Sequence, residues 1–382
     1  MAPDERGVYI AGFALLKTVA VVSSLSLGQI AIHQISERRN NSVGDIGGGL
    51  LMGSILFPAL VLLVLCAYGY IDSEFRRIYL DRFLPLLVVG LPIFVLEIYF
   101  YSFLTALGRL NTGNKAIVIG KTLAWGGVLM LALLRGHLSN TEVLVSLVCG
   151  HVAIVFGYTV GVISEFDRRA IRLSFDRQNF WRMVKKSFQL HPSIIGSIIF
   201  GGIDILIAYK LLGPKAASEY QIAVQILAAL SVLPFAIAQF AFKNVSQLGA
   251  SEAWKQFQPI LFKLLGLHCV LAVMLVLLID YIAHNLFHGQ YINVSQLFVI
   301  MVFGAPGTFL SLIMAPFWIG FVYFTTTSLL TIITGALMLP LCYSLTYHYN
   351  VEGAAANFLI GQALSVVING IFIWKLRQNQ YA

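Results

Sequence analysis

Charged residues are scarce in this sequence: they make up only 11% of its 382 residues, whereas 58% are hydrophobic. A soluble protein typically has about 25% charged residues. The mean hydropathy of +0.83 and the long apolar runs therefore exclude a soluble globular domain. The runs are also continuous, which is not the alternating pattern of a membrane β-barrel. The composition predicts an all-α, polytopic membrane protein.

Several chemical signatures are also missing. The sequence has no G-x-x-x-x-G-K-[ST] nucleotide loop, no His/Cys cluster with metal-ligand spacing and no soluble domain that could hold either. Its four cysteines lie inside apolar runs, which is typical of packing residues: Cys66, Cys149, Cys269 and Cys342. These absences predict a protein that is not an enzyme and has no cofactor and no metal site. The net charge of +8 is interpreted as a signal of membrane topology and not of nucleic-acid binding.

Eleven apolar segments have about the length that an α-helix needs to cross a bilayer. They lie near residues 8–34, 46–70, 83–107, 115–134, 142–164, 190–212, 219–242, 258–283, 295–317, 322–346 and 353–374. One set of loops carries fifteen Lys and Arg residues and the opposite set carries seven. Positive charge gathers on the cytoplasmic side, so this asymmetry predicts a cell-membrane protein with a cytoplasmic C-terminus and an N-terminus outside.

The longest loop, residues 165–186, is basic and amphipathic (EFDRRAIRLSFDRQNFWRMVKK). We interpret it as a linker helix that lies on the anionic inner leaflet of the bilayer. The predicted organisation is a five-span bundle at 1–166, a basic cytoplasmic linker at 167–187 and a six-span bundle at 188–382.

The two bundles share one layout. At an offset of 211 residues, Pro3 aligns with Pro214 and Tyr9 with Tyr220, and Gly150 aligns with Gly361 inside a later span. This pattern predicts an internal repeat of about half the chain, with the two halves parallel. The first copy lacks the arm that Pro192–Leu212 supplies in the second. Since the topology also leaves the N-terminus outside, the sequence predicts a six-plus-six parent and a gene product that starts upstream of Met1.

Four segments of the sequence resemble motifs of a known family. They are the two hairpin starts APDERGVYIAGFALL and LGPKAASEYQIAVQIL, the turn TALGRLNTGNKA and the segment NVEGAAANFLIGQ. In their order and spacing they are similar to the polysaccharide (O-antigen type) flippases of the multidrug/oligosaccharidyl-lipid/polysaccharide exporter (MOP) superfamily. The resemblance implies two parallel MATE-like bundles around a cleft that opens alternately to either side. It implies that the substrate is a polyprenyl-diphosphate-linked oligosaccharide, flipped from the inner to the outer leaflet for polysaccharide biosynthesis. Polysaccharide polymerase and glycosyltransferases would be partners.

Ionisable residues inside predicted spans are the candidate site residues, because each costs about 2.5–3.5 kcal/mol at a helix centre. They are Lys17, Glu97, Lys121, Asp204 and Lys263. The three lysines could bind a diphosphate as point charges. The two acids could pair with the lysines or take up a coupling ion, H⁺ or Na⁺.

Structural roles compete with each of these assignments. Lys121 and Lys263 could extend to the membrane interface, Lys17 and Glu97 could form a buried pair, and Asp204 could bond a neighbouring helix. His151 and His268 are interpreted as packing residues. Three other functions also stay open: a cation-coupled multidrug exporter, a membrane glycosyltransferase or polymerase, and an inactive truncated fragment.

Overall fold

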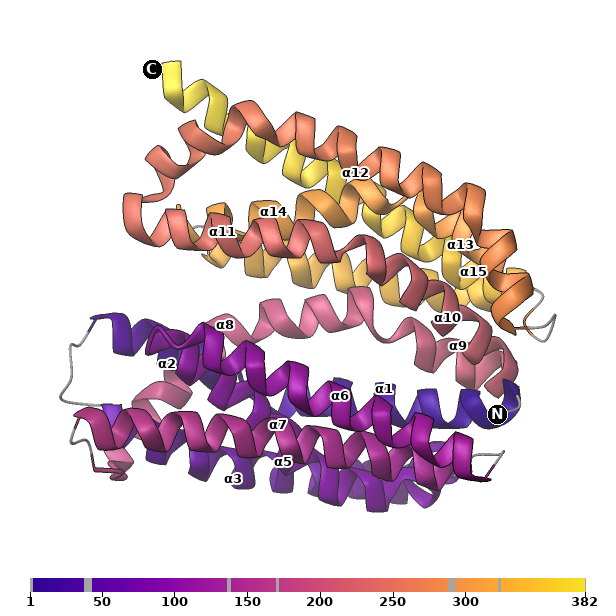
Figure 1. Ribbon diagram of the computed structural model, residues 1–382, viewed down its shortest axis with the longest axis horizontal. Coiled ribbons are helices and arrows are strands. Elements are labelled where there is room, and N and C mark those ends of the chain that lie inside the picture. Colours follow the sequence, from indigo (N-terminus) through magenta and orange to yellow (C-terminus); the bar gives the residue numbers. More distant parts are fainter. Residues whose placement is uncertain are drawn as a thin grey trace. The chain divides into compact units, whose positions relative to one another are not determined.

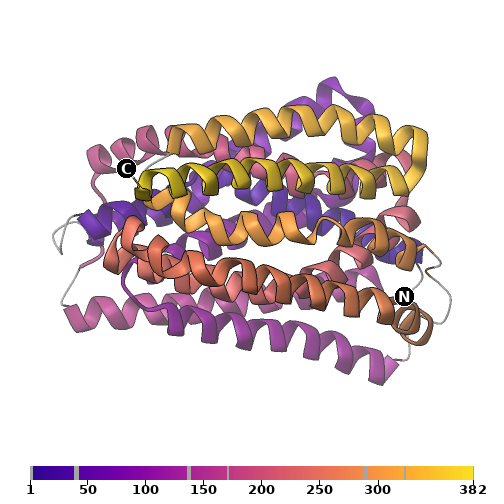
Figure 2. The same cartoon turned by 90° about the horizontal axis from the view of Figure 1, so that it is seen from above.

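The computed structural model describes residues 3–37, 43–135, 139–169, 172–287, 291, 293–321 and 324–381, whose regular structure is entirely helical. The chain divides into two compact units, a first unit from Met1 to Ile195 and a second unit from Gly196 to Ala382. Within each unit the long helices run along one another, as Figure 1 shows from the side and Figure 2 from above. The all-α class predicted from the sequence is therefore confirmed.

The first unit is built from long helices. It contains α1 (Pro3–Ser23), α2 (Leu27–Glu37), α3 (Val43–Ile71), the short α4 (Ser73–Phe75), the π-helical turn η1 (Arg76–Leu80), α5 (Asp81–Ala106), α6 (Leu110–Arg135), α7 (Asn140–Arg169) and most of α8 (Arg177–Gly201). The second unit contains α9 (Asp204–Leu212), α10 (Pro214–Leu230), α11 (Val232–Leu248), α12 (Ala250–Phe287), α13 (Val294–Val302), α14 (Ala305–Gly320) and α15 (Phe324–Tyr381).

Among the described residues, seven helices are long and apolar enough to cross a membrane, or nine spans if each of two bent pairs counts as one. The sequence predicts eleven. The other two predicted spans fall on α8 and α9, which are interrupted at Gly202, and on the second arm of α15. That arm follows a kink at Tyr349 and Asn350, where the backbone is not helical. The described helices are thus compatible with the eleven membrane spans predicted from the sequence.

Prolines explain the bends of the α10–α11 and α13–α14 pairs. A proline ring clashes with the carbonyl group four residues before it, and α10 ends at Leu230, four residues before Pro234. The bend there is 47°, so the kink predicted at Pro234 is present. The α13–α14 pair follows the same rule: α13 ends at Val302, four residues before Pro306, and the bend is 54°.

The polar break at Gly213-Pro214 is shorter than the sequence suggests. We expected the next helix to restart near Ser218 and Glu219, but α10 begins at Pro214 itself. Proline is suited to the first helical position because its φ angle is already helical and its missing N–H would have had no partner there. Gly213 alone makes the turn, with a φ of 87° that favours glycine.

The predicted repeat is visible in the order of the helices. α1 begins at Pro3 and α10 at Pro214, the two prolines that the offset aligns. The packing partners also recur: α1 and α2 pack on α5 in the first unit, while α10 packs on α13 and α11 on α14 in the second. Each unit therefore builds the same arrangement from its own half of the chain.

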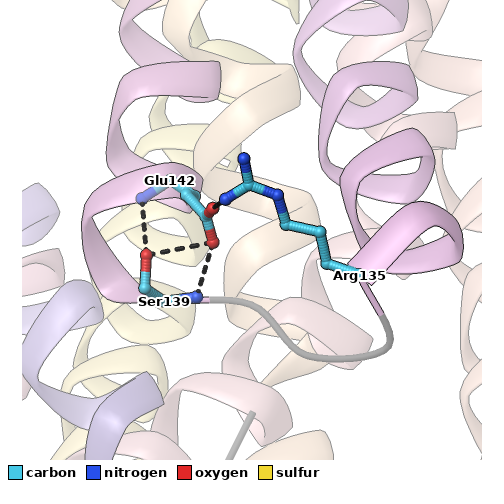
Figure 3. A network of polar contacts seen from close by, with 3 residues as sticks. All are labelled: Arg135, Ser139 and Glu142. Atoms are coloured by element: carbon cyan, nitrogen blue, oxygen red, sulfur yellow. Dashed lines mark hydrogen bonds and ion pairs between the residues drawn. The ribbon is translucent and has the colours of Figure 1, made fainter.

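Polar contacts hold both ends of the α6–α7 pair. At one end, the Ser139 hydroxyl accepts a hydrogen bond from the Glu142 backbone N–H (3.3 Å), and the Glu142 carboxylate accepts one from the Ser139 N–H (2.9 Å). This reciprocal capping box starts α7, and Arg135 at the end of α6 pairs with the same carboxylate (Figure 3). At the other end, Arg109 pairs with the buried Glu165 at 2.5 Å. The two pairs fix the register of α6 against α7.

Candidate binding site in the first unit

Two glycines let α6 and α7 touch backbone to backbone. A Cβ atom on Gly150 would lie 2.4 Å from the Ala124 side chain and 2.7 Å from the carbonyl oxygen of Gly120. Such close approach between membrane helices is typical of small residues. Lys121 and His151 directly follow the two glycines, so the contact brings their side chains together.

His151 bridges an acid and a lysine at this contact. Its Nδ1 lies 2.5 Å from a carboxylate oxygen of Glu97 on α5, and its Nε2 lies 3.3 Å from the Lys121 ammonium nitrogen. An ammonium group can only donate, so Nε2 accepts and Nδ1 carries the proton that is donated to Glu97. We assign a neutral imidazole from these partners. His151 is buried, with 3% of its surface exposed.

Lys17 of α1 adds a second positive charge. Its ammonium group interacts electrostatically with both Lys121 and Glu97 and lies 5.0 Å from the centre of the Phe13 ring. With Glu97 ionised, His151 neutral and both lysines charged, the four side chains carry a net charge of +1. Because Lys17 is exposed, this excess charge is accessible to an anion. We call these four residues the charged cluster.

Aromatic rings surround the bridging histidine. Phe94 of α5 lies 4.1 Å and Phe13 of α1 lies 5.8 Å from the centre of the His151 ring. Tyr158, one per cent exposed, packs against Tyr101 with ring centres 6.1 Å apart. Phe13 and Phe94 thus cover the His151 ring with apolar surface, where electrostatic interactions are stronger than in water.

The Gly120–Gly150 contact gives a direct test of this packing. Replacing Gly150 by alanine should lower the stability of the purified protein by about 1–3 kcal/mol, the usual cost of overpacking. Gly126, also on α6, has no atom within 4 Å of an added Cβ. Gly126→Ala should therefore stabilise the helix slightly, since alanine is the better helix former. Thermal unfolding in detergent measures both variants, and equal shifts in their midpoints would contradict the proposed contact.

Asp204 occupies a separate, buried position in the second unit. It starts α9, where one carboxylate oxygen accepts the N–H of Ile205 at 2.9 Å and the other accepts the hydroxyl of Tyr220 from α10. Cys342 of α15 interacts electrostatically with the same carboxylate. Asp204 thus bonds a neighbouring helix, one of the three roles that the sequence left open.

The remaining candidates differ in their surroundings. Lys263 is exposed on α12 of the second unit. His268 is buried on the same helix and packs on Phe309, with ring centres 5.2 Å apart. Of the predicted site residues, the structure brings together Lys17, Glu97 and Lys121.

Sequence reasoning missed the bridging role of His151, which it interpreted as a packing residue. Its two ring nitrogens instead contact Glu97 and Lys121. One signal was present in the sequence: His151 follows Gly150, which the repeat aligns with another glycine-polar pair, Gly361 and Gln362. Glu97 and Lys121 lie 54 and 30 positions away from His151 on other helices, however, and no periodicity reveals these pairings.

No protein-family model and no curated protein matches the sequence. Solved structures share its fold. A multidrug resistance MATE family transporter of the MOP superfamily, inward-facing, has a TM-score of 0.73 at 13% identity, covering 99% of this chain and 92% of that one. Lipid II flippase MurJ, in an inward closed conformation, has a TM-score of 0.75 at 13% identity, covering 98% and 82%.

An outward-facing MATE family transporter of the MOP superfamily also has this fold, with a TM-score of 0.61 at 14% identity. It covers 97% of this chain and 85% of that one. The chain therefore has the fold of MATE and MurJ transporters, and its apolar helices make it a multi-pass membrane protein. The MATE-like fold that the resemblance implied is confirmed, whereas membership of the O-antigen type flippases stays a prediction.

Proposed function

We propose that this protein is a transporter that moves a polyprenyl-diphosphate-linked oligosaccharide from the inner to the outer leaflet of the cell membrane by alternating access. The observation that carries the proposal is the composition of the charged cluster, in which two lysines, Lys17 and Lys121, lie close to a single acid, Glu97. A diphosphate needs fixed cations along its path, and Lys17 offers an exposed ammonium group. The proposal further places the C-terminus in the cytoplasm, as the loop charges indicate.

The two intramembrane acids are the proposed sites of ion coupling. Glu97 already balances one lysine through His151, so uptake of a proton at Glu97 would raise the net charge of the cluster to +2. That change would strengthen the binding of an anion. Asp204 is buried against Tyr220 and is the candidate for H⁺ or Na⁺ uptake in the second unit.

Reconstitution tests the proposal. The purified protein would be placed in liposomes that contain a fluorescent polyprenyl-diphosphate-linked oligosaccharide, and a membrane-impermeant reagent would report which leaflet holds the label. We expect the label to cross faster than in protein-free liposomes, and faster still under a proton or sodium gradient. A rate equal to that of protein-free liposomes under both gradients would contradict the proposal.

A cation-coupled multidrug exporter is the second candidate. The MATE neighbours match the chain about as well as the MurJ structure, and Glu97, with 20% of its side chain exposed, could bind a cationic compound. Efflux of a cationic dye from cells that lack their own exporters distinguishes the two. Efflux that Glu97→Gln abolishes, together with no movement of the labelled lipid, would favour the exporter.

A further inference from the structure

An open crevice runs along the surface of the first unit, between α3, α5 and α7. Its volume is about 740 Å³, and its lining includes Leu51, Ile55, Leu96 and Val155. Ile55 of α3 is 67% exposed, so the α3 wall of the crevice is open to the outside of the first unit. A volume of this size falls in the range of small-molecule sites. None of its lining residues belongs to the charged cluster.

The crevice offers few hydrogen bonds to a ligand, and none from a free side-chain donor. Only two of its lining side chains are polar, and both hydroxyls are already bonded inside the protein. Ser54 donates to the carbonyl oxygen of Leu51 at 2.8 Å, and Ser174 donates to the carboxylate of Asp45 at 2.5 Å. A polar molecule would lose most of its hydrogen bonds to water there without replacement. The chemistry of the lining therefore selects a hydrocarbon chain.

One end of the crevice is closed by Leu173, Ser174 and Phe175, which belong to the non-helical segment 172–176 between α7 and α8. This segment packs directly on two glycines of α3. A Cβ atom on Gly44 would lie 2.1 Å from the carbonyl oxygen of Arg172, and one on Gly48 would lie 2.1 Å from that of Ser174. The Ser174 N–H also donates to the Gly44 carbonyl oxygen at 3.3 Å. The closed end is thus fixed in place next to the start of α8.

Basic residues gather beside this closed end. Residues 172–186 contain five Lys and Arg residues and one acid, Asp176. The first turns of α8 pack Phe180 against Phe57 of α3, with ring centres 6.2 Å apart, while Arg177 and Arg182 are exposed. The loop charges predict that this end lies on the cytoplasmic side. An apolar crevice therefore ends at a basic surface at the level of lipid head groups.

We propose that this crevice binds one anionic phospholipid of the cytoplasmic leaflet. An acyl chain occupies the crevice between α3, α5 and α7, and the phosphate head group lies against Arg177 and Arg182. Clusters of Lys and Arg next to membrane helices favour anionic head groups, and the apolar lining accepts the chain. This site does not bind the transported substrate, so the proposal does not depend on the proposed function and is tested separately from it.

Photo-crosslinking of the unmodified protein tests the position of the lipid. Phosphatidylglycerol with a diazirine on one acyl chain would be added to the delipidated protein, and crosslinked peptides would be identified by mass spectrometry. We expect crosslinks concentrated on residues 48–55, 92–96 and 152–155. Crosslinks spread evenly over all exposed apolar helices would overturn the proposal. If unlabelled polyprenyl phosphate displaced the probe at lower concentration than unlabelled phosphatidylglycerol, the choice of occupant would be wrong.

Matched variants test the two halves of the site by native mass spectrometry with phosphatidylglycerol and phosphatidylcholine. Val155→Trp fills the crevice and should remove most of the bound lipid, whereas Val160→Trp, on the same helix outside the crevice, should not. Arg177→Gln with Arg182→Gln should lower phosphatidylglycerol binding about thirtyfold and phosphatidylcholine binding much less, because its head group has no net charge. Equal binding of the two lipids by the unmodified protein, or no effect of Val155→Trp, would refute the site.

Discussion

Lys17→Ala is expected to lower translocation of the lipid-linked oligosaccharide by roughly 10- to 100-fold while the protein still folds. Hydrogen bonds to charged groups contribute about 1.5–3 kcal/mol, and each 1.4 kcal/mol corresponds to about a factor of ten. Lys17 is the exposed member of the cluster, and its removal takes the net charge from +1 to 0. Removal of a charge from a membrane helix also makes insertion easier, so expression should not fall. The liposome assay measures the rate, and gel filtration in detergent checks the fold.

Two further variants separate phosphate binding from a general effect of charge. Lys17→Arg keeps the charge and should retain part of the rate. Lys263→Ala removes an exposed lysine from α12 in the second unit and should change the rate by less than a factor of about three. Full activity of Lys17→Ala would show that Lys17 does not bind the substrate. A loss with Lys263→Ala as large as with Lys17→Ala would show that the effect is not specific to the charged cluster.

Most of the fold could be predicted from the sequence because the determining signals are local. Apolar runs of membrane-spanning length mark the helices, and Pro234 marks a bend that the α10–α11 pair has. The break between α1 and α2 could not be predicted. It depends on Leu25 and Ser26, which have φ angles of 46° and 57°, and such angles are uncommon for residues other than glycine. The Tyr99 hydroxyl, from a distant helix, donates to the Ser24 carbonyl oxygen at 2.7 Å and helps to hold this break.

The candidate site was only partly predictable for a related reason. A charged residue inside an apolar segment can be recognised from that segment alone, because its burial in a membrane helix is costly. This signal identified Lys17, Glu97 and Lys121. Which charges meet depends on helix packing: the Gly120–Gly150 contact places Lys121 against His151. Asp204 has the same signature in the sequence, yet its partner is the hydroxyl of Tyr220. Hydropathy does not distinguish these two environments.

His151→Leu is expected to disrupt the charged cluster and to lower translocation at least tenfold. Leucine fills similar space but can neither donate to Glu97 nor accept from Lys121. The loss of such bonds leaves partly buried charged groups without partners, which costs about 1–3 kcal/mol or more. We therefore also expect a lower unfolding midpoint, unlike the result for Lys17→Ala. Thermal unfolding and the liposome assay on the same preparation measure both effects.

His151→Gln and His268→Leu are the controls for this prediction. The glutamine amide offers one donor and one acceptor, so His151→Gln should recover part of the stability and part of the rate. His268 is equally buried, but its ring packs on Phe309, and His268→Leu should be tolerated because leucine suits that apolar environment. If the two leucine variants behaved alike, His151 would be a packing residue, as the sequence first suggested. A selective loss with His151→Leu, partly restored by glutamine, would instead establish that its hydrogen bonds join α5, α6 and α7 into one binding site.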